Sequence, residues 1–386
     1  MKTAIILGTQ SFMDGGTKVG SQYLAEALVD AGWKIDYVAT ASSLLDVWGR
    51  KRHARLKRVW RQKQDAVGIN LRPGLTELAF KAPFPALGLF LRWRWQLNAY
   101  SWFVPKAVQQ HTYDVCISDV TPNMLYLPWV RAKTKILRLN DWPPGFAHDL
   151  HPLLIERMEA GLIQASFDEV WAISRPLATY ATKLNGRNKV LFLPNGVEDT
   201  FLNVTTPIPK KPNSAVYIGA LGAWFDIDLL KRTAVLLPQW HFDLYGAGSQ
   251  ALSSLPPNIK GHGSVARADV PALLSRYEVG LIPFADTDNR MAYVERPLKF
   301  YEYIAAGLGV ACTDHGAMRS GMGDLAAYGS SGPDYADAIV QARSQAKQRE
   351  PGFGGAFVRA HGWTSVAREV EERLQALTQT AQESAP

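Results

Sequence analysis

The sequence of 386 residues has little cysteine: only Cys116 and Cys312, each inside an apolar run with the pattern of a buried strand. Two such residues cannot supply the disulfide framework of a small secreted protein, so we expect a chain that works in a reducing compartment. No cysteines and histidines have the spacing of a zinc site, and no metal is expected. Apolar residues make up 47% of the chain and charged residues 20%, which excludes a disordered or low-complexity protein.

Long apolar segments are also missing. The uncharged run 82–91 is far shorter than the ~20 residues that a membrane-spanning helix needs. The chain begins directly with a strand pattern at Thr3, so we expect no signal peptide. These features predict a cytoplasmic protein, soluble or peripheral on the inner face of the cell membrane.

Both common glycine-rich phosphate fingerprints are missing. The first glycine loop reads GTQSFMDGG from Gly8, which does not match G-x-G-x-x-G. No glycine directly precedes Lys18, as a P-loop would require. The sequence therefore predicts neither a typical dinucleotide enzyme nor a P-loop NTPase.

Acidic residues are missing from one strongly basic segment. Residues 50–63 hold eight Lys or Arg among fourteen and no Asp or Glu; because the net charge of the chain is +7, all other residues together carry −1. Cations around a partly apolar helical face are typical of a helix lying on anionic lipid. RNA binding is the alternative for a basic run, although no nucleic acid partner is expected. The residues that we expect to contact the membrane or the acceptor here are Trp48, Arg52, Arg55 and Trp60.

An aromatic run follows at 84–103. Trp93 and Trp95 lie in it, with arginines between the aromatic residues. Such a mixture suits the headgroup region of a bilayer, and burial in the protein core is the alternative. We expect Trp93 and Trp95 to contact an anionic membrane surface.

Strand and helix patterns alternate along the chain, which predicts open, largely parallel sheets with helices on their faces. A polar, proline-rich segment at 205–213 separates two such series and is the best candidate for a linker. We therefore expect an N-terminal Rossmann-like domain at 1–204, a C-terminal one at 205–360 and a final helix within 361–386. The predicted strands are 3–7, 34–40, 115–118, 135–139, 169–173 and 189–193 in the first series, and 214–218, 240–245, 279–284 and 309–313 in the second.

The segment 279–314 carries the most specific chemistry. A predicted strand and a polar loop lead to Pro297, which suits the start of a helix because it lacks an N–H. Lys299 and Glu302 are three residues apart and share one face of that helix. Because a cation near a helix N-terminus opposes the helix dipole, the lysine indicates an external anion; an exposed Lys–Glu pair is the alternative.

This segment, PLKFYEYIAAGLGV from Pro297, resembles the donor-binding motif of GT-B glycosyltransferases, P-L-K-x-Y-E-x-x-A-x-G-x-P-V. The resemblance implies that Glu302 contacts the ribose of a nucleotide and that Lys299 lies near its diphosphate. Gly309 stands where the family has proline, and Glu295 and Glu302 are seven residues apart where many retaining members have a spacing of eight.

The resemblance extends along most of the chain and implies a GT-B fold of two Rossmann-like domains, an interdomain cleft and a C-terminal helix that returns to the first domain. The glycine turns at Gly219 and Gly246 follow predicted strands, where open α/β folds bind ligands; a simple tight turn is the alternative for each. The residues expected to bind the donor are Gly219, Ala220, Leu221, Phe284, Glu295, Arg296, Lys299 and Glu302.

A finer likeness is to the membrane-associated glucuronosyltransferases of xanthan biosynthesis. In them a strand ending in arginine, two residues and an aspartate carries the catalytic base, and Arg138-Leu-Asn-Asp141 has this form. The likeness implies that Asp141 is the general base of an inverting transfer. A turn cap before Trp142 is the alternative for Asp141, and His148 and Asp149 are alternative bases.

Two D-x-D triplets, at Asp226 and at Asp286, resemble the metal-binding motif of GT-A enzymes. The first stands at a predicted helix start and the second in a loop, which favours helix capping and solvation. We therefore expect metal-independent activity, with Lys299 and backbone N–H groups supplying the positive charge.

Together these features predict a bacterial glycosyltransferase of exopolysaccharide biosynthesis. It would move glucuronate or a hexose from a nucleoside diphosphate, expected to be UDP, to a lipid-linked oligosaccharide or polysaccharide precursor. The nucleotide sugar is a co-substrate, and no cofactor is expected. The alternatives are a nucleotide-sugar epimerase of the same fold and a non-catalytic membrane- or RNA-binding protein.

Overall fold

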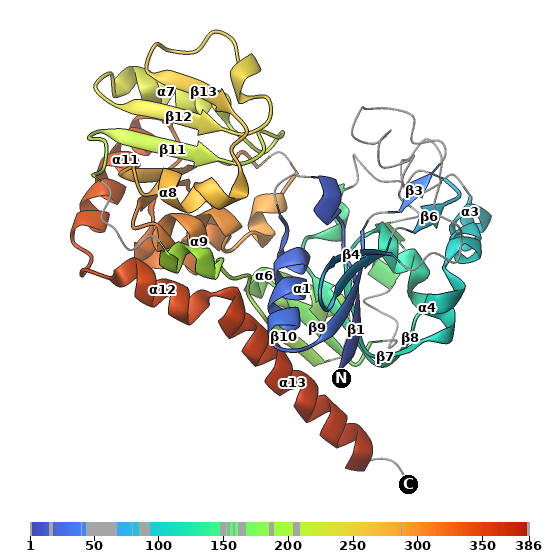
Figure 1. Cartoon of the computed structure of the whole chain (residues 1–386). Helices are drawn as coiled ribbons and strands as arrows, with labels where there is room; N and C mark the ends of the chain where they lie inside the picture. The colour runs from blue at the N-terminus through green and yellow to red at the C-terminus, as the bar shows by residue number, and fades with distance from the viewer. Residues whose placement is uncertain are drawn as a thin grey trace. The chain divides into compact units, whose positions relative to one another are not determined.

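The computed structural model describes residues 2–14, 18–39, 41–43, 68–78, 80–84, 93–146, 152, 155–156, 159–160, 167–184, 189–203, 209–286 and 288–383. The chain divides into two compact units (Figure 1). The N-terminal unit comprises Met1–Pro194 and Ala367–Pro386, and the C-terminal unit comprises Asn195–Val366. None of the described helices is both long and apolar enough to cross a membrane.

The N-terminal unit is built on an eight-stranded sheet with the order β10-β9-β8-β7-β1-β2-β5-β4. Every neighbouring pair is parallel except β4 and β5, which form an antiparallel edge hairpin. The strands are β1 (Thr3–Leu7), β2 (Lys34–Val38), β4 (Ile69–Arg72), β5 (Leu75–Leu78), β7 (Thr112–Asp119), β8 (Arg131–Leu139), β9 (Glu169–Ala172) and β10 (Lys189–Phe192).

Short elements complete this unit. The larger helices are α1 (Gly20–Asp30) and α6 (Arg175–Leu184), and β3 (Ser42–Ser43) pairs in parallel with β6 (Lys81–Ala82). Shorter helices with described bounds are α3 (Arg94–Asn98) and α4 (Lys106–Gln110), and the 3-10 turns include η1 (Phe12–Asp14), η2 (Ala99–Phe103), η3 (Pro122–Trp129) and η4 (Pro143–Phe146).

The C-terminal unit contains a six-stranded sheet with the order β13-β12-β11-β14-β15-β16, in which all pairs are parallel. Its strands are β11 (Ser214–Ile218), β12 (His241–Tyr245), β13 (Ile259–Gly263), β14 (Val279–Ile282), β15 (Gly309–Thr313) and β16 (Ala327–Gly329). Its helices are α7 (Ile227–Leu236), α8 (Val270–Leu274), α9 (Leu298–Ala305), α10 (Gly316–Met322), α11 (Gly332–Lys347) and α12 (Phe353–His361).

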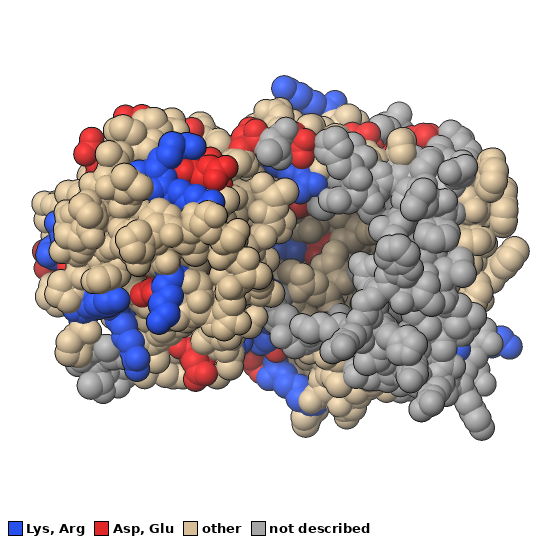
Figure 2. Space-filling view, turned by 90° about the horizontal axis from the view of Figure 1, so that it is seen from above, with Lys and Arg blue, Asp and Glu red and all other residues tan. Residues whose placement is uncertain are grey.

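Charged side chains of both signs lie close together on the surface of this unit. Figure 2 shows this on one face, where blue and red side chains of the C-terminal unit (left) are neighbours. Arg319 and Asp314, for example, form a two-pronged ion pair with distances of 2.9 and 2.6 Å. Interspersed charges of this kind give weaker long-range fields than a band of one sign would.

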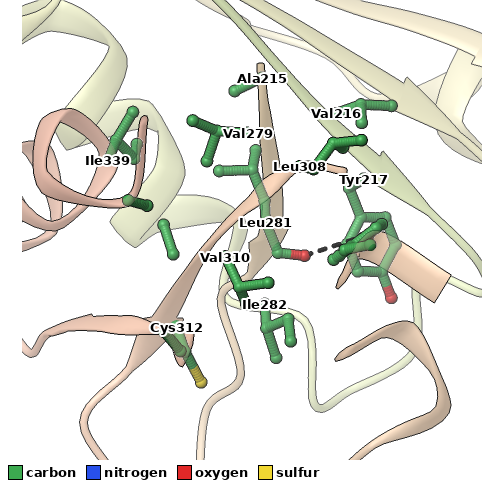
Figure 3. Close-up of a cluster of buried hydrophobic side chains, with 14 of the residues drawn as sticks. Ala215, Val216, Tyr217, Val279, Leu281, Ile282, Leu308, Val310, Cys312 and Ile339 are labelled. Carbon is green, nitrogen blue, oxygen red and sulfur yellow. Dashed lines mark hydrogen bonds between the residues drawn. The ribbon is translucent and has the colours of Figure 1, made fainter. Parts of the chain in front are cut away.

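The core of the C-terminal unit joins buried strand residues of the sheet with helix residues that cover it, such as Ile339 of α11 (Figure 3). Val216, Leu281 and Val310 come from three neighbouring strands and are fully buried. A parallel sheet covered on both faces needs such continuous apolar strands. Tyr303 of α9 reaches this sheet, because its hydroxyl donates to the carbonyl of Leu281 at 3.3 Å. The helix that carries Lys299 is thereby tied to the edge of β14.

The last helix, α13 (Trp363–Glu383), belongs to the N-terminal unit from Ala367 onward. Val370 and Leu374 are buried, so this side of the helix packs against the protein. Arg373 donates from Nε to both carboxylate oxygens of the buried Glu169 of β9, at 2.8 and 2.9 Å. A charge-assisted, bidentate contact of this kind fixes the helix on the sheet of the N-terminal unit.

Candidate functional site

Helix α9 places Lys299 and Glu302 on one face at the carboxyl edge of the C-terminal sheet. Pro297 is its N-cap residue, with φ −65°, so the helix begins where the missing N–H of proline has no cost. Lys299 is half-buried and Glu302 is 8% exposed. The predicted start of the helix is confirmed to within one residue.

The ammonium of Lys299 lies against the turn that follows β11. Gly219 has φ +145°, and a Cβ built there would stand 2.5 Å from Nζ of Lys299. Glycine suits this position, because a side chain would displace the ammonium from where it lies and would strain a backbone with positive φ. Gly246 lies against Gly219 itself, since a Cβ on Gly246 would be 1.9 Å from the carbonyl oxygen of Gly219. The structure therefore brings together the two glycine turns that the sequence singled out.

Within the described part of the chain, Lys299 contacts aromatic rings and forms no ion pair. Its Nζ lies 5.0 Å from the ring centroid of Tyr217 and 6.0 Å from that of Phe284. Among the residues that the structure describes, none forms a hydrogen bond or an ion pair with this ammonium. Burial lowers the pKa of Lys299, while Glu302 raises it in part and Arg267 lowers it again. A cation that has lost hydration without gaining a partner is suited to bind an anion.

Phe284 is held by its backbone. Its N–H donates to Oγ1 of Thr313 at 3.0 Å, and its carbonyl accepts from the same hydroxyl at 2.9 Å. Nε2 of His315 contacts that carbonyl at 2.7 Å. The ring beside Lys299 is thus positioned by groups at the carboxyl end of β15.

Glu302 forms an ion pair that the sequence did not reveal. Nη2 of Arg267 lies 2.6 Å from Oε1 of Glu302, and Nε of Arg267 donates to Oε2 of Glu198 at 2.8 Å. Arg267 stands in the 3-10 turn η7 (Arg267–Asp269), which follows β13. No motif marks this arginine, because its two partners lie far away in the sequence.

Glu295 and Arg296, which precede α9 and are also predicted to bind the donor, contact α10. Glu295 is 2% exposed and packs against α10, where a Cβ on Gly321 would lie 2.2 Å from its Cγ. Arg296 donates from Nε to the carbonyl of Gly321 at 2.7 Å. Burial lowers the pKa of His361, and the charge of Arg296 lowers it further. Glu295 and Arg296 therefore both contact α10 at Gly321.

Ala220 and Leu221 extend the turn after Gly219. Ala220 is exposed, and its carbonyl accepts from the hydroxyl of the buried Tyr217 at 2.7 Å. Leu221 is partly buried and packs against the core of the unit. Together with Gly219 they present backbone groups at the end of β11, next to Lys299.

The chain was compared with protein-family models, curated proteins and solved structures, and only the solved structures match it. No family model and no curated protein matches the sequence. Solved structures do match: the chain aligns with sucrose-phosphate synthase from Thermosynechococcus elongatus with a TM-score of 0.69 and 15% identity, over 98% of this chain and 100% of that one. The fold is GT-B.

Two further structures agree. A glycosyltransferase from Rickettsia africae aligns with a TM-score of 0.64 and 13% identity over 98% of both chains. HepE from Anabaena, solved in complex with UDP-glucose, aligns with a TM-score of 0.63 and 13% identity over 97% of this chain and 100% of that one. At such identities the likeness establishes the GT-B arrangement of the elements, which confirms the predicted fold, and leaves the reaction to the chemistry of the site.

Asp141 lies in the N-terminal unit, two residues beyond the end of β8. Its Oδ1 accepts from the N–H of Trp142 at 2.9 Å, and the side chain is half-buried. The neighbouring Asn140 accepts from the N–H of Val120 at 2.9 Å, which ties this turn to the end of β7. Asp141 therefore stands at the carboxyl edge of the sheet, where α/β folds place functional groups.

Arg138, the first residue of the predicted R-x-x-D motif, has a structural partner. It forms a buried ion pair with Asp119 at 2.8 Å, and the two side chains are 5% and 2% exposed. The two residues are opposite each other in the pairing of β7 with β8. Removing either partner would leave a buried charge unpaired, so Arg138 has a structural role in pairing with Asp119.

The D-x-D triplets behave as caps and turns. Asp226 is the N-cap of α7 and accepts from the N–H of Leu229 at 2.7 Å, as the sequence indicated. Asp286 accepts from the N–H of Met291 at 3.3 Å. Within the described ranges, no group of three or more His, Cys, Asp or Glu residues could hold a metal ion.

The predicted membrane contacts lie only partly within the described residues. The side chains of Trp93 and Trp95 are 58% and 57% exposed, and the nearby Trp102 is 73% exposed. Exposed tryptophans in such number are unusual on a soluble surface. The remaining residues of interest, Trp48, Arg52, Arg55, Trp60, His148 and Asp149, lie outside the described part of the chain.

Proposed function

We propose that the protein is a glycosyltransferase that takes its sugar from a nucleoside diphosphate, with UDP as the nucleotide. The observation that carries this proposal is the ammonium of Lys299, which has no ionic or hydrogen-bond partner among the described residues and lies against the backbone of Gly219, beside a glutamate on the same helix. A phosphate-bearing ligand would supply the missing negative charge, and the GT-B fold of the chain is one that serves such donors in proteins such as HepE, solved with UDP-glucose.

Each donor residue has a proposed part. Lys299 neutralises the diphosphate as it leaves, while Gly219, Ala220 and Leu221 present backbone groups that let the phosphates approach. Phe284 borders the nucleotide. Glu302 accepts hydrogen bonds from the ribose hydroxyls with its carboxylate.

Arg296 and Glu295 are proposed to face the sugar. The described residues provide a hydrogen bond only to Nε of Arg296, so its two terminal nitrogens remain available. A guanidinium with two free nitrogens matches the carboxylate of a glucuronate, which agrees with the finer likeness to the xanthan glucuronosyltransferases. A hexose is the alternative sugar.

Asp141 is the proposed general base. It removes the proton from an acceptor hydroxyl while the oxygen of that hydroxyl attacks the anomeric carbon. The bond from that carbon to the diphosphate oxygen breaks, and its electron pair leaves with the diphosphate. Attack opposite the leaving group inverts the configuration, and Lys299 stabilises the charge without a metal ion.

The proposed acceptor is a lipid-linked oligosaccharide or polysaccharide precursor, reached by an enzyme that is peripheral on the inner face of the membrane. The exposed Trp93 and Trp95 support this proposal from the described residues. The basic run 50–63 supports it from the sequence, because it concentrates the whole excess of positive charge in one segment.

The experiment that tests this function offers the purified protein a panel of UDP-sugars together with membrane-extracted acceptor and follows the products by mass spectrometry. We expect a mass gain on the acceptor equal to one sugar residue and the release of UDP. Conversion of the UDP-sugar without acceptor would identify an epimerase instead. Absence of UDP binding in calorimetry, together with absence of product, would refute the proposal.

A further inference from the structure

We infer that Arg267 is a positioning residue that orients the carboxylate of Glu302 for the ribose of the donor nucleotide. This inference rests on the proposed function, because it concerns how the same site reads its ligand. Arg267 is not part of the donor motif on α9 and has no neighbour in sequence that points to such a role.

The geometry joins three separate segments of the C-terminal unit. Arg267 contributes from η7, Glu302 from α9, and Glu198 from the chain just after Val197. Nη2 of Arg267 is 2.6 Å from Glu302, and its Nε is 2.8 Å from Glu198. The side chains of Arg267, Glu302 and Glu198 are only 23%, 10% and 14% exposed.

The two contacts use different nitrogens of one rigid guanidinium. Because the guanidinium is planar, holding Nε on Glu198 sets the direction in which Nη2 points. Glu302 then accepts through Oε1, which fixes the rotation of its carboxylate. A lysine has a single nitrogen on a flexible chain and cannot impose both contacts in the same way.

The second oxygen of Glu302 is the one that matters for binding. No hydrogen bond to Oε2 of Glu302 comes from the residues that the structure describes. A carboxylate can only accept hydrogen bonds, so this oxygen is complementary to a group that donates, such as a ribose hydroxyl. Arg267 therefore holds Oε1 of Glu302 and leaves Oε2 in a fixed orientation to accept a hydrogen bond from the ligand.

Preorganisation of this kind should appear as selectivity for the ribose hydroxyls. A ligand that lacks the hydroxyl gains nothing from an oriented Glu302, whereas a ligand that has it avoids the cost of ordering the side chain. Loss of Arg267 should therefore weaken the binding of UDP more than the binding of a deoxy analogue. A purely structural ion pair would affect both ligands equally.

The test measures dissociation constants by titration calorimetry for UDP, 2′-deoxy-UDP and 3′-deoxy-UDP. For the unchanged protein we expect UDP to bind about tenfold more tightly than at least one deoxy analogue, a usual value for one hydrogen bond to a charged acceptor. In Arg267→Gln we expect this ratio to fall to about threefold or less. Glu198→Gln, which weakens the anchor of Arg267, should reduce the ratio in part.

Two further variants keep the test decisive. Arg267→Lys retains the positive charge between two carboxylates and is therefore the variant more certain to fold. We expect its ratio of UDP affinity to deoxy-UDP affinity to lie between those of the unchanged protein and Arg267→Gln. Arg343→Gln is the matched control: Arg343 lies in the same unit and donates to Asn213 at 2.6 Å, at the amino edge of the sheet. Its ratio should not change.

The outcomes separate the inference from the function on which it rests. If the unchanged protein binds UDP and both deoxy analogues equally, or if Arg267→Gln and Arg267→Lys weaken all three ligands by one factor, the inference is wrong and the proposed function stands. If the unchanged protein binds none of the three, the proposed function itself fails.

Discussion

Nζ of Lys299 occupies the space that a side chain on Gly219 would need, because a Cβ at that position would lie 2.5 Å from the ammonium. This relationship joins the first turn of α9 to the end of β11. It makes the cation and the glycine turn parts of one site, although eighty residues separate them in the sequence.

Gly219→Ala should therefore impair the donor site. The methyl group displaces the ammonium and strains a backbone with positive φ, so we expect the affinity for UDP to fall by about tenfold or more, measured by calorimetry. Gly248→Ala is the control, because Gly248 also has positive φ (+88°) but no heavy atom within 4 Å of its added Cβ. An equal effect of both substitutions would show that backbone strain, and not Lys299, is responsible.

The pH dependence of UDP binding should report the titration of Lys299. Burial lowers the pKa of this ammonium in the folded protein. As the pH rises, Lys299 therefore loses its proton before the pH reaches the usual lysine pKa of about 10.4. Affinity should be retained near neutral pH and should fall as the pH rises toward that value. In Lys299→Met we expect weak binding without this alkaline decline. Binding of the unchanged protein that stays constant to about pH 10 would contradict the assignment.

Asp141→Asn should separate transfer from binding. The amide keeps the shape of the side chain but cannot take the proton, so the transfer rate should fall by about 10²–10⁴-fold. UDP affinity should remain within about twofold, because the donor residues lie in the other unit. Asp149→Asn is the comparison, since Asp149 is the alternative base. Loss of activity in Asp149→Asn alone would transfer the role to that residue.

Removal of divalent cations should leave the transfer reaction intact. Asp226 is used as a helix cap, and Lys299 can supply the positive charge that a metal would otherwise provide. Product formation should be unchanged by excess EDTA, as followed by mass spectrometry. Loss of turnover on chelation and its recovery with manganese would instead favour a metal–diphosphate mechanism.

The double variant Trp93→Ala/Trp95→Ala should weaken membrane association. Both indoles are more than half exposed, and tryptophan prefers the interface of a bilayer. In sedimentation with anionic liposomes we expect most of the bound fraction to be lost. Val235→Ala/Leu236→Ala is the control, because these α7 side chains are also exposed, at 68% and 51%.

The basic segment offers an independent test of the same association. Arg52→Gln/Arg55→Gln should weaken binding by about fivefold for each charge at low salt, and less at high salt, since a cation near an anionic surface contributes ~1 kcal/mol. No binding to liposomes at any salt concentration would refute the membrane proposal, and equal binding to neutral and anionic liposomes would contradict the role of the basic segment.

Much of the fold was predictable because buried parallel strands are short, apolar and bounded by turn residues. The strands at Thr3–Leu7, Ser214–Ile218 and Gly309–Thr313 have the predicted bounds. The hairpin of β4 and β5 was missed, because both strands are only four residues long and carry polar residues, and β4 lies at the edge of the sheet with no buried residue. Helix α11 was missed as well, since its buried face consists largely of small residues such as Ala338 and Ala342.

Local patterns also located the motif on α9, with Pro297 at its start and Lys299 and Glu302 on one face. Spacing along a helix is a property of neighbouring residues, and a sequence contains that information directly. The roles of these residues in donor binding remain predictions until the variants are measured.

The sequence by itself determined the alternation of strands and helices in two Rossmann-like series, because periodicity and turn chemistry are local, and the resemblance of the segment from Pro297 implied the GT-B fold. Only the tertiary structure decided that Lys299 meets Gly219 and has no ionic partner among the described residues, and that Glu302 is held by Arg267. These contacts join segments that are far apart along the chain. They depend on how the strands are ordered within the sheet, which no short pattern records.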